Sequence, residues 1–206
     1  MVPMRARNLI VATGLVGLVT SLASAQLNTL TPQEAIEGWK LLFDGKSLNG
    51  WEIHGAANWL VKDAALACPA NAASWLGTVD TYSDFRLRLE FRVPEKANSG
   101  VFLRSQKDSH PASSGYELQI WDYRTGGFNT GSLVNAIEAT PNKIVPDQWN
   151  LFEVTAQGDH FLIVHNGQLV LDGHDSKHAS GVIGLQCNAD HNPVEFRNIR
   201  LLPLPK

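Results

Sequence analysis

The chain has 206 residues and a formal net charge of -3, with 17 Lys and Arg residues against 20 Asp and Glu. This balance provides no basic stripe, so nucleic acid is not an expected partner. The length suits one large all-β domain, and no Pro-, Gly- or Ser-rich linker divides the sequence.

The N-terminus has the order of a secretory signal peptide. Residues 1–7 carry two arginines and no acid, residues 9–22 are an uncharged apolar run, and Ala23, Ser24 and Ala25 offer a small-residue cleavage site. The apolar run is shorter than the ~20 residues that span a bilayer. We therefore expect export to the periplasm or the extracellular space, with cleavage after Ala25 and no membrane insertion of the mature chain.

A short helix is predicted next. Thr31 can cap it, Pro32 suits its first position, and Glu34 completes a capping box. The chain then divides into a signal peptide (1–25), an N-terminal segment with this helix (26–37) and one β-domain (38–203).

Strand patterns fill the remainder of the chain. Residues 85–93 alternate apolar and charged side chains, which predicts Phe85, Leu87, Leu89, Phe91 and Val93 in a core. Asn166 and Gly167 form a hairpin signal, since both turn positions favour positive φ. Further strands are predicted at residues 101–104, 116–121, 151–156, 161–165, 168–171, 182–186 and 194–202. Many short strands with little helix indicate a β-sandwich or barrel.

The predicted strand 116–121 carries the first candidate site residues. Period-two alternation places Glu117, Gln119 and Trp121 on one face. A carboxylate, an amide and an indole can meet a sugar through hydrogen bonds and a flat apolar surface. The alternative is an ordinary solvated polar face, which half-exposed antiparallel sheets usually have.

Residues 98–104 repeat this arrangement, with Phe102 and Arg104 expected on one side of a strand. An arginine beside an aromatic ring suits a carboxylate or a hydroxyl-rich ligand. The alternative is a surface arginine whose side chain simply lies along its aromatic neighbour.

Two loop positions complete the candidates. Asp122 follows its strand directly, and His191 precedes the predicted strand 194–202. Loops at strand ends collect functional side chains, and imidazole can act as a general base or a metal ligand. A solvated loop histidine is the alternative for His191. No H-E-x-x-H, nucleophile elbow, P-loop or Rossmann pattern is found.

Cys68 and Cys187 are the two cysteines of the chain. In an exported protein an even count permits a disulfide. The sequence leaves this pairing and two separate buried thiols equally open.

Four segments together carry a resemblance to a known family. They read LLFDGKSLNGW (41–51), NSGVFLR (98–104), YELQIWD (116–122) and VEFRNIRL (194–201). In this order they resemble the 3-keto-disaccharide hydrolase domain family, over residues 38–202. The resemblance implies a concanavalin A-like jelly-roll sandwich of two antiparallel sheets, whose concave face binds sugar, and activity on glycosides oxidised at C3.

The resemblance also implies site residues. It places Arg104, Glu117, Gln119 and Asp122 on the concave face, and makes His191 the counterpart of a histidine before the last strand. The surrounding sequence departs from the family where Asn192 stands in place of a usual glycine.

A ketone at C3 acidifies the proton on C2, so elimination followed by hydration can cleave the glycosidic bond. The expected base is His191 or Glu117, and Arg104 or a bound divalent metal stabilises the enolate. A metal could draw ligands from Glu117, Asp122 and His191, but no cofactor is established by the sequence. The expected sugar contacts are Gln119, Trp121, Asp122 and Phe102.

A non-catalytic carbohydrate-binding module or lectin is the rival interpretation, because one sandwich fold supports both functions. It would use Trp121, Phe102 and Gln119 without any base. An ordinary glucanase is disfavoured, since the strand at Glu117 has an amide, Gln119, where a second carboxylate would be needed.

Overall fold

The computed structural model describes residues 26–190 and 192–205. The expected signal peptide and His191 lie outside the described residues. Neither of the described helices has the length and apolarity that a membrane span requires.

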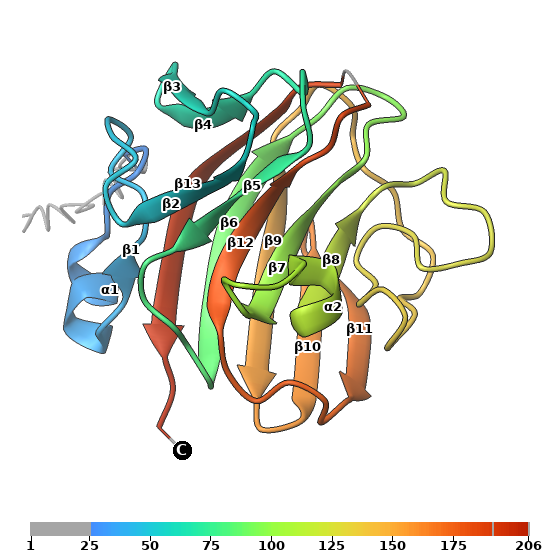
Figure 1. Cartoon of the computed structure of the whole chain (residues 1–206). Coiled ribbons are helices and arrows are strands. Elements are labelled where there is room, and N and C mark those ends of the chain that lie inside the picture. The colour runs from blue at the N-terminus through green and yellow to red at the C-terminus, as the bar shows by residue number, and fades with distance from the viewer. Residues whose placement is uncertain (1–25, 191, 206) are drawn as a thin grey trace, which may run out of the picture.

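The protein is a sandwich of two antiparallel sheets (Figure 1). The eight-stranded sheet has the order β11-β10-β9-β6-β13-β4-β3, and β1 also pairs with β13. Its strands are β1 (Lys40–Leu41), β3 (Leu60–Lys62), β4 (Ala65–Cys68), β6 (Phe85–Arg92), β9 (Asn150–Gln157), β10 (His160–His165), β11 (Gln168–His174) and β13 (Val194–Pro203).

The five-stranded sheet has the order β2-β5-β12-β7-β8 and lies in front in Figure 1. Its strands are β2 (Trp51–Gly55), β5 (Ser74–Thr78), β7 (Ser99–Ser105), β8 (Tyr116–Ile120) and β12 (Val182–Cys187). The expected all-β jelly-roll sandwich with a short N-terminal helix is confirmed.

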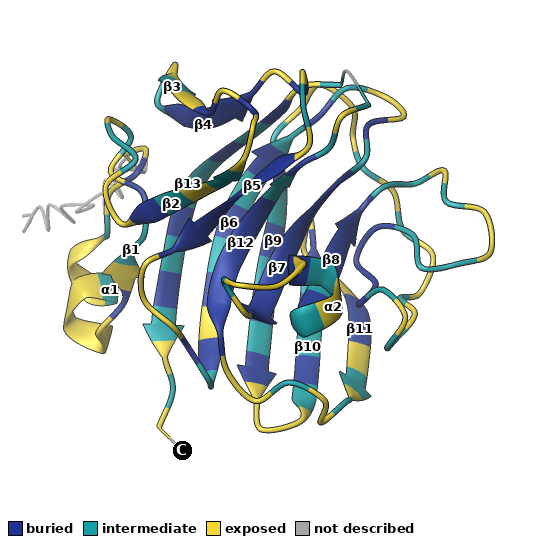
Figure 2. Cartoon of the chain, in the orientation of Figure 1, coloured by how far each residue is buried: buried dark blue, intermediate teal, exposed yellow. Residues whose placement is uncertain are grey.

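The inner faces of the two sheets form the core. Phe85, Leu87, Leu89 and Phe91 of β6 are fully buried, as their alternation predicts, and Figure 2 shows buried positions alternating with partly exposed ones along these strands. Each such side chain contributes about 1.5–3 kcal/mol through removal of apolar surface from water. Asn166 and Gly167 have φ of 49° and 82°, as their hairpin requires.

Two helices flank the sandwich. Helix α1 (Pro32–Glu37) begins at Thr31, whose hydroxyl accepts a hydrogen bond from the Glu34 amide in the predicted capping box. Helix α2 (Pro111–Ser114), which the sequence patterns did not predict, lies over the five-stranded sheet beside β7 and β8.

Cys68 and Cys187 form a disulfide, so the alternative of two separate thiols is wrong. Cys68 ends β4 of the eight-stranded sheet and Cys187 ends β12 of the five-stranded sheet. The bond closes a separation of 119 residues and ties the two sheets together at one end. It therefore holds the end of β12 in place.

Candidate functional site

The outer face of the five-stranded sheet is formed by side chains that alternate with core residues. The ladder aligns them in two rows across the sheet. Glu117 pairs with Phe102, Phe102 with Gly184, Gly184 with Gly77, and Gly77 with Glu52. In the second row Gln119 pairs with Gly100, Gln186 with Trp75, and Trp75 with His54.

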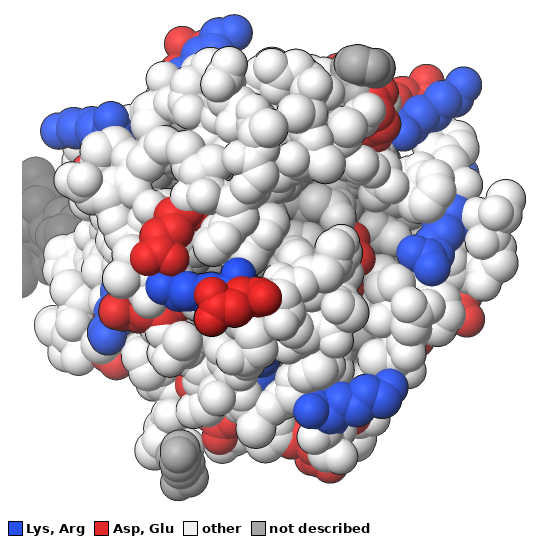
Figure 3. Space-filling model, viewed as in Figure 1, with Lys and Arg blue, Asp and Glu red and all other residues white. Residues whose placement is uncertain are grey.

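Glycines let the side chains of this outer face lie flat on the sheet. A Cβ atom on Gly100 would lie 3.0 Å from both Cγ and Oε1 of Glu117. A Cβ on Gly77 would lie 2.6 Å from the Trp75 ring, and one on Gly184 would crowd Phe102 and Trp75. The face is therefore hollowed, as Figure 3 shows, with Lys, Arg, Asp and Glu side chains gathered around a mostly uncharged middle.

Glu117 lies on the edge strand β8, at the end of the first row opposite Glu52. Its Oε1 accepts a hydrogen bond of 3.1 Å from Nε2 of Gln186. Burial raises the pKa of the Glu117 carboxyl, against the opposing effects of the Gln186 hydrogen bond and the charge of Arg124. A carboxyl whose burial holds its pKa nearer neutrality is suited to accept and return a proton.

Several polar atoms on the outer face make no hydrogen bond to the protein. Oε1 of Gln119 and Oε1 of Gln186 are buried without one, and so is Nε2 of His54, which lies 4.0 Å from the Glu52 carboxylate. Buried polar groups in proteins are usually paired, because an unpaired one costs about 1–3 kcal/mol. The face therefore retains hydrogen-bonding capacity that a hydroxyl-rich ligand could use.

Aromatic rings cover the other end of this face. The His54 and Trp75 rings stack with centroids 4.0 Å apart, and Phe102 meets Trp75 edge-on at 5.9 Å. Sequence reasoning missed His54, Trp75 and Gln186, although Glu52 and His54 alternate with their neighbours. The signal is weak because these strands are short and β5 is buried along its whole length.

The placement of Arg104 on this face is wrong. Its φ is +55°, next to an irregular register between β7 and β12, so the side chain leaves the alternation. The guanidinium lies 5.2 Å from the centroid of the core residue Phe161 and is 1% exposed.

All three nitrogens of the Arg104 guanidinium are engaged by the protein. They donate to the carbonyl oxygens of Ser83, Gly158 and His178 and to the carboxylate of Asp84. Such a side chain has no reach to a substrate on the outer face. Arg104 instead joins the ends of four chain segments, which corrects its expected role in stabilising an enolate.

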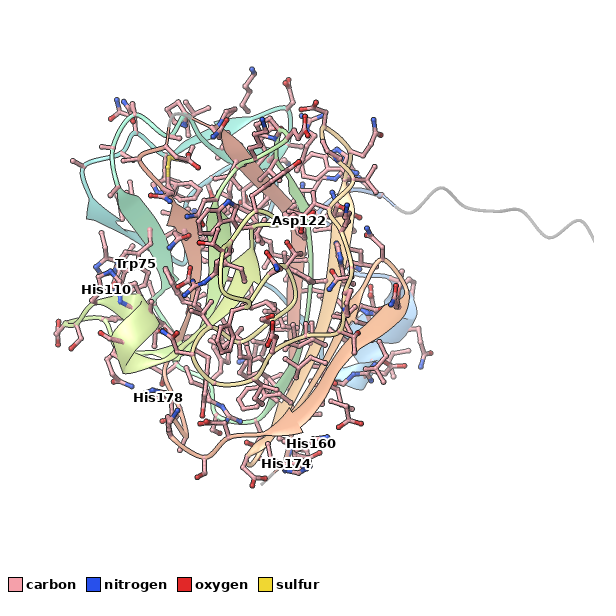
Figure 4. The ribbon with its side chains drawn as sticks, turned by 90° about the vertical axis from the view of Figure 1, so that its right-hand side faces the viewer. Trp75, His110, Asp122, His160, His174 and His178 are labelled. Atoms are coloured by element: carbon pink, nitrogen blue, oxygen red, sulfur yellow. A yellow bond between two sulfur atoms is a disulfide. The ribbon has the colours of Figure 1, made fainter. Side chains whose placement is uncertain are left out.

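The residues that follow β8 are no longer paired with β7. Trp121 lies beyond the last residue of the strand and is half-buried, so alternation no longer fixes its direction. Oδ2 of Asp122 accepts a hydrogen bond of 2.8 Å from the Ile144 amide, which anchors the loop that follows. In Figure 4 Asp122 lies well apart from Trp75, so the structure does not bring Asp122 to the aromatic end of the outer face.

The structure places the flanks of His191 but not His191 itself. Asp190 accepts a hydrogen bond from the Asn98 amide, next to β7. Within residues 26–190 and 192–205, no three His, Cys, Asp or Glu side chains are grouped as a metal site would need. The role of His191 and the requirement for a metal therefore stay predictions.

Solved structures share this fold. A putative glycosyl hydrolase from Parabacteroides distasonis aligns with a TM-score of 0.74 at 19% identity, covering 87% of this chain and 100% of that one. A second from the same organism has a TM-score of 0.69 at 23% identity over 81% and 99% of the two chains. The carbohydrate-binding module CBM66 from Bacillus subtilis has a TM-score of 0.56 at 21% identity over 73% and 94%. At these identities the similarity shows the fold alone.

Sequence comparison adds the family. A curated relative, the 3-keto-disaccharide hydrolase of Bacteroides thetaiotaomicron, is 22% identical over 187 residues, covering 75% of this chain and 64% of the relative. The profile of the 3-keto-alpha-glucoside-1,2-lyase-like domain matches residues 38–202, most of the chain. The protein therefore belongs to the family of 3-keto-α-glucoside-1,2-lyase-like domains.

Proposed function

We propose that the protein cleaves the glycosidic bond of a 3-keto-disaccharide or 3-keto-glycoside on the outer face of its five-stranded sheet, with Glu117 as the general base. The observation that carries this proposal is the Glu117 carboxyl, which is half-buried, accepts a hydrogen bond from the Gln186 amide, and has its pKa raised by burial. The family and the name of the curated relative support the choice of an oxidised substrate.

The reaction begins with the C2 proton, which the ketone at C3 acidifies. Glu117 accepts this proton, and the electron pair of the C–H bond forms an enolate with the C3 oxygen. Collapse of the enolate forms the C1–C2 double bond and breaks the C1–O bond, and the leaving oxygen takes up a proton. Water then adds across the double bond, so the net result is hydrolysis.

Two side chains are suited to stabilise the enolate in place of Arg104. Arg124 has a charge that acts on Glu117 and makes no salt bridge among the described residues. The Gln119 amide is buried with an unpaired oxygen, and turning the amide over would present its NH₂ group instead. A preorganised donor or cation at a developing negative charge is worth several kcal/mol of barrier.

The test uses a 3-keto-glycoside and its unoxidised parent. Only the ketone makes the C2 proton removable near neutral pH, so the oxidised compound is expected to be cleaved and the parent left intact. Product made in heavy water should carry deuterium at C2. Equal turnover of both compounds would point to oxocarbenium chemistry, and binding of both without turnover would favour a carbohydrate-binding module.

We also propose that the chain works outside the cytoplasm, on the strength of the leader-like residues 1–25 and the disulfide. Secreted material should begin at Gln26 or its cyclised form. N-terminal mass analysis that still finds Met1 would contradict export by this route.

A further inference from the structure

The proposed reaction needs a second group that transfers a proton, apart from Glu117. In an α-glucoside, the substrate in the family's name, the C2–H bond and the C1–O bond are axial and point to opposite faces of the sugar ring. A base that removes the C2 proton therefore lies across the ring from the leaving oxygen and cannot protonate it. An alkoxide is a poor leaving group near neutral pH, so an acid on the other side of the ring lowers the barrier.

A pocket of about 340 Å³ on the outer face of the five-stranded sheet has groups of this kind on two sides. Gln186 lines it and donates from Nε2 to the Glu117 carboxylate, which places the proposed base beside the pocket. His54 lines it from β2, at the opposite edge of the sheet from β8, and Trp75 and Phe102 line it between them. A sugar ring in this pocket would therefore have Glu117 on one side and His54 on the other.

The imidazole of His54 is held in one orientation. It stacks on the Trp75 ring with centroids 4.0 Å apart and an angle of 10° between the planes. Nε2 is buried, 4.0 Å from the carboxylate of Glu52, which in turn binds Lys107 at 2.8 Å. The side chain is 26% exposed, and the buried Nε2 leaves Nδ1 as the ring nitrogen available to a ligand. A ring fixed in this way needs little further ordering to act on a substrate.

His110 also lines the pocket and lies at the same edge of the molecule as Trp75 (Figure 4). Both histidines have suitable chemistry, because imidazole gains or loses its proton between about pH 5 and 8. His110 is exposed before α2, however, and its side chain does not cap that helix. An acid that acts in the transition state needs a fixed position, which favours His54.

We propose that His54 is the general acid of the reaction and gives its Nδ1 proton to the leaving oxygen as the C1–O bond breaks. The electron pair of that bond passes to the oxygen, the enolate becomes a C1–C2 double bond conjugated with the C3 ketone, and the imidazolium becomes neutral. His54 then takes a proton from the water that attacks C1, and Glu117 returns its proton to C2. Both side chains end as they began. This assignment rests on the proposed function.

The first experiment varies the leaving group. The methanol oxygen of methyl 3-keto-α-glucoside needs a proton to leave, whereas 4-nitrophenolate is a stable anion that leaves without one. His54→Phe keeps an aromatic ring on Trp75 and removes the proton. It should lower kcat for the methyl glycoside by about 10²–10⁴-fold and leave kcat for 4-nitrophenyl 3-keto-α-glucoside almost unchanged. His160→Ala is the control, because His160 pairs with Asp172 on β10 and β11 of the other sheet.

The second experiment separates the acid from the base in heavy water. Without its acid, the enolate that Glu117 forms returns to substrate instead of expelling the alkoxide. Uncleaved methyl 3-keto-α-glucoside should therefore gain deuterium at C2 in the presence of His54→Phe and should not gain it above the enzyme-free rate with Glu117→Gln. Proton NMR follows this exchange, and general damage to the site would abolish it in both variants.

Three results would overturn the assignment of His54 and leave the proposed function standing. They are equal slowing of the two glycosides in His54→Phe, full activity of this variant on both, and loss of its C2 exchange. If the wild-type protein cleaves neither 3-keto-glycoside, the proposed function fails, and the assignment of His54 fails with it.

Discussion

The two outer faces of the sandwich are both polar, yet their side chains are satisfied in different ways. On the eight-stranded sheet, charged residues pair with each other across neighbouring strands. Arg88 binds Glu153, Arg92 binds Glu195, and Arg197 binds Glu90. Trp149 adds a flat surface under Arg92 and Arg197.

On the five-stranded sheet Glu52 pairs with Lys107 at one edge, but several amide and imidazole groups make no hydrogen bond. Among the described residues, the buried atoms of Gln119, Gln186 and His54 that make no hydrogen bond all belong to this face, and no such atom belongs to the outer face of the other sheet. Glycines hollow the same face. A face whose groups satisfy each other contributes to stability, whereas one with unpaired groups and space above it is suited to a ligand.

Of the substitutions that test the difference between the two faces, Glu117→Gln should lower the catalytic rate most. Loss of a general base lowers the rate by about 10²–10⁴-fold. Glu153→Gln, the same change on the eight-stranded sheet, should leave kcat within about twofold, since its carboxylate binds Arg88 on the opposite face. Steady-state rates of both variants on one 3-keto substrate make the comparison. Full activity of Glu117→Gln would mean that another residue is the general base, and His191 is the next candidate.

The pH dependence of the same residue follows from its raised pKa. The base form is lost as the pH falls through this pKa, so the rate of the wild type should fall on the acid side. Stability runs the other way. Since the folded pKa lies above the unfolded one, the cost of ionising Glu117 is absent at low pH and appears as the pH rises through the folded pKa. Glu117→Gln should therefore raise the melting temperature at neutral pH and leave it unchanged in acid.

Arg104→Met should show the next largest effect, and on stability rather than on substrate binding. The substitution leaves Asp84 and three carbonyl oxygens without their buried donor. Removal of one partner from such a cluster costs about 3 kcal/mol or more. Urea unfolding should show this loss, with KM of the folded fraction unchanged at low temperature. A raised KM with unchanged stability would instead indicate that Arg104 contacts the substrate.

Arg104 also shows a limit of predicting side-chain direction from alternation along a strand. Alternation correctly placed the core residues of β6 and the direction of Glu117 and Gln119, because both depend only on neighbours along one strand. The same rule failed at Arg104, where positive φ and a register shift against β12 redirect the side chain. A shift of this kind depends on a strand about 80 residues away in sequence.

The site as a whole could be predicted only in part for a similar reason. Glu117 and Gln119 belong to one strand, so alternation along it places them together. His54, Trp75 and Gln186 lie on the same face only because β2, β5 and β12 pair with each other. Their order across the sheet is not their order in the chain, and β4 and β5 are buried on both sides with no alternation. The resemblance to the family implied the fold, which the structure confirms, and the reaction, which stays a proposal. The registers of these strands show which other side chains lie beside Glu117 and Gln119.

Gly100→Ala should have a smaller effect that is specific to the hollowed face. The added methyl group would lie 3.0 Å from Oε1 of Glu117 and displace the carboxylate. Small displacements of a catalytic group reduce rates substantially, and we expect about a 10-fold loss of kcat. Gly173→Ala on β11 is the matched control, because the three atoms nearest to its methyl group all belong to the flexible side chain of Ile137. Equal activity of the two variants would mean that the position of Glu117 does not limit the reaction.

The smallest effect is expected for the charged face itself. Glu195 and Arg92 form a hydrogen-bonded ion pair between β13 and β6, with 17% and 36% of their side chains exposed. Exposed ion pairs contribute about 0.2–1 kcal/mol, because water screens the attraction and both side chains lose freedom. A double-mutant cycle with Glu195→Gln and Arg92→Gln should therefore give a coupling free energy in that range, weaker at high salt, and leave turnover unchanged. A coupling near zero would still agree with a solvated face, but a loss of turnover in either single variant would mean that the eight-stranded sheet takes part in function, and the contrast between the two faces would no longer hold.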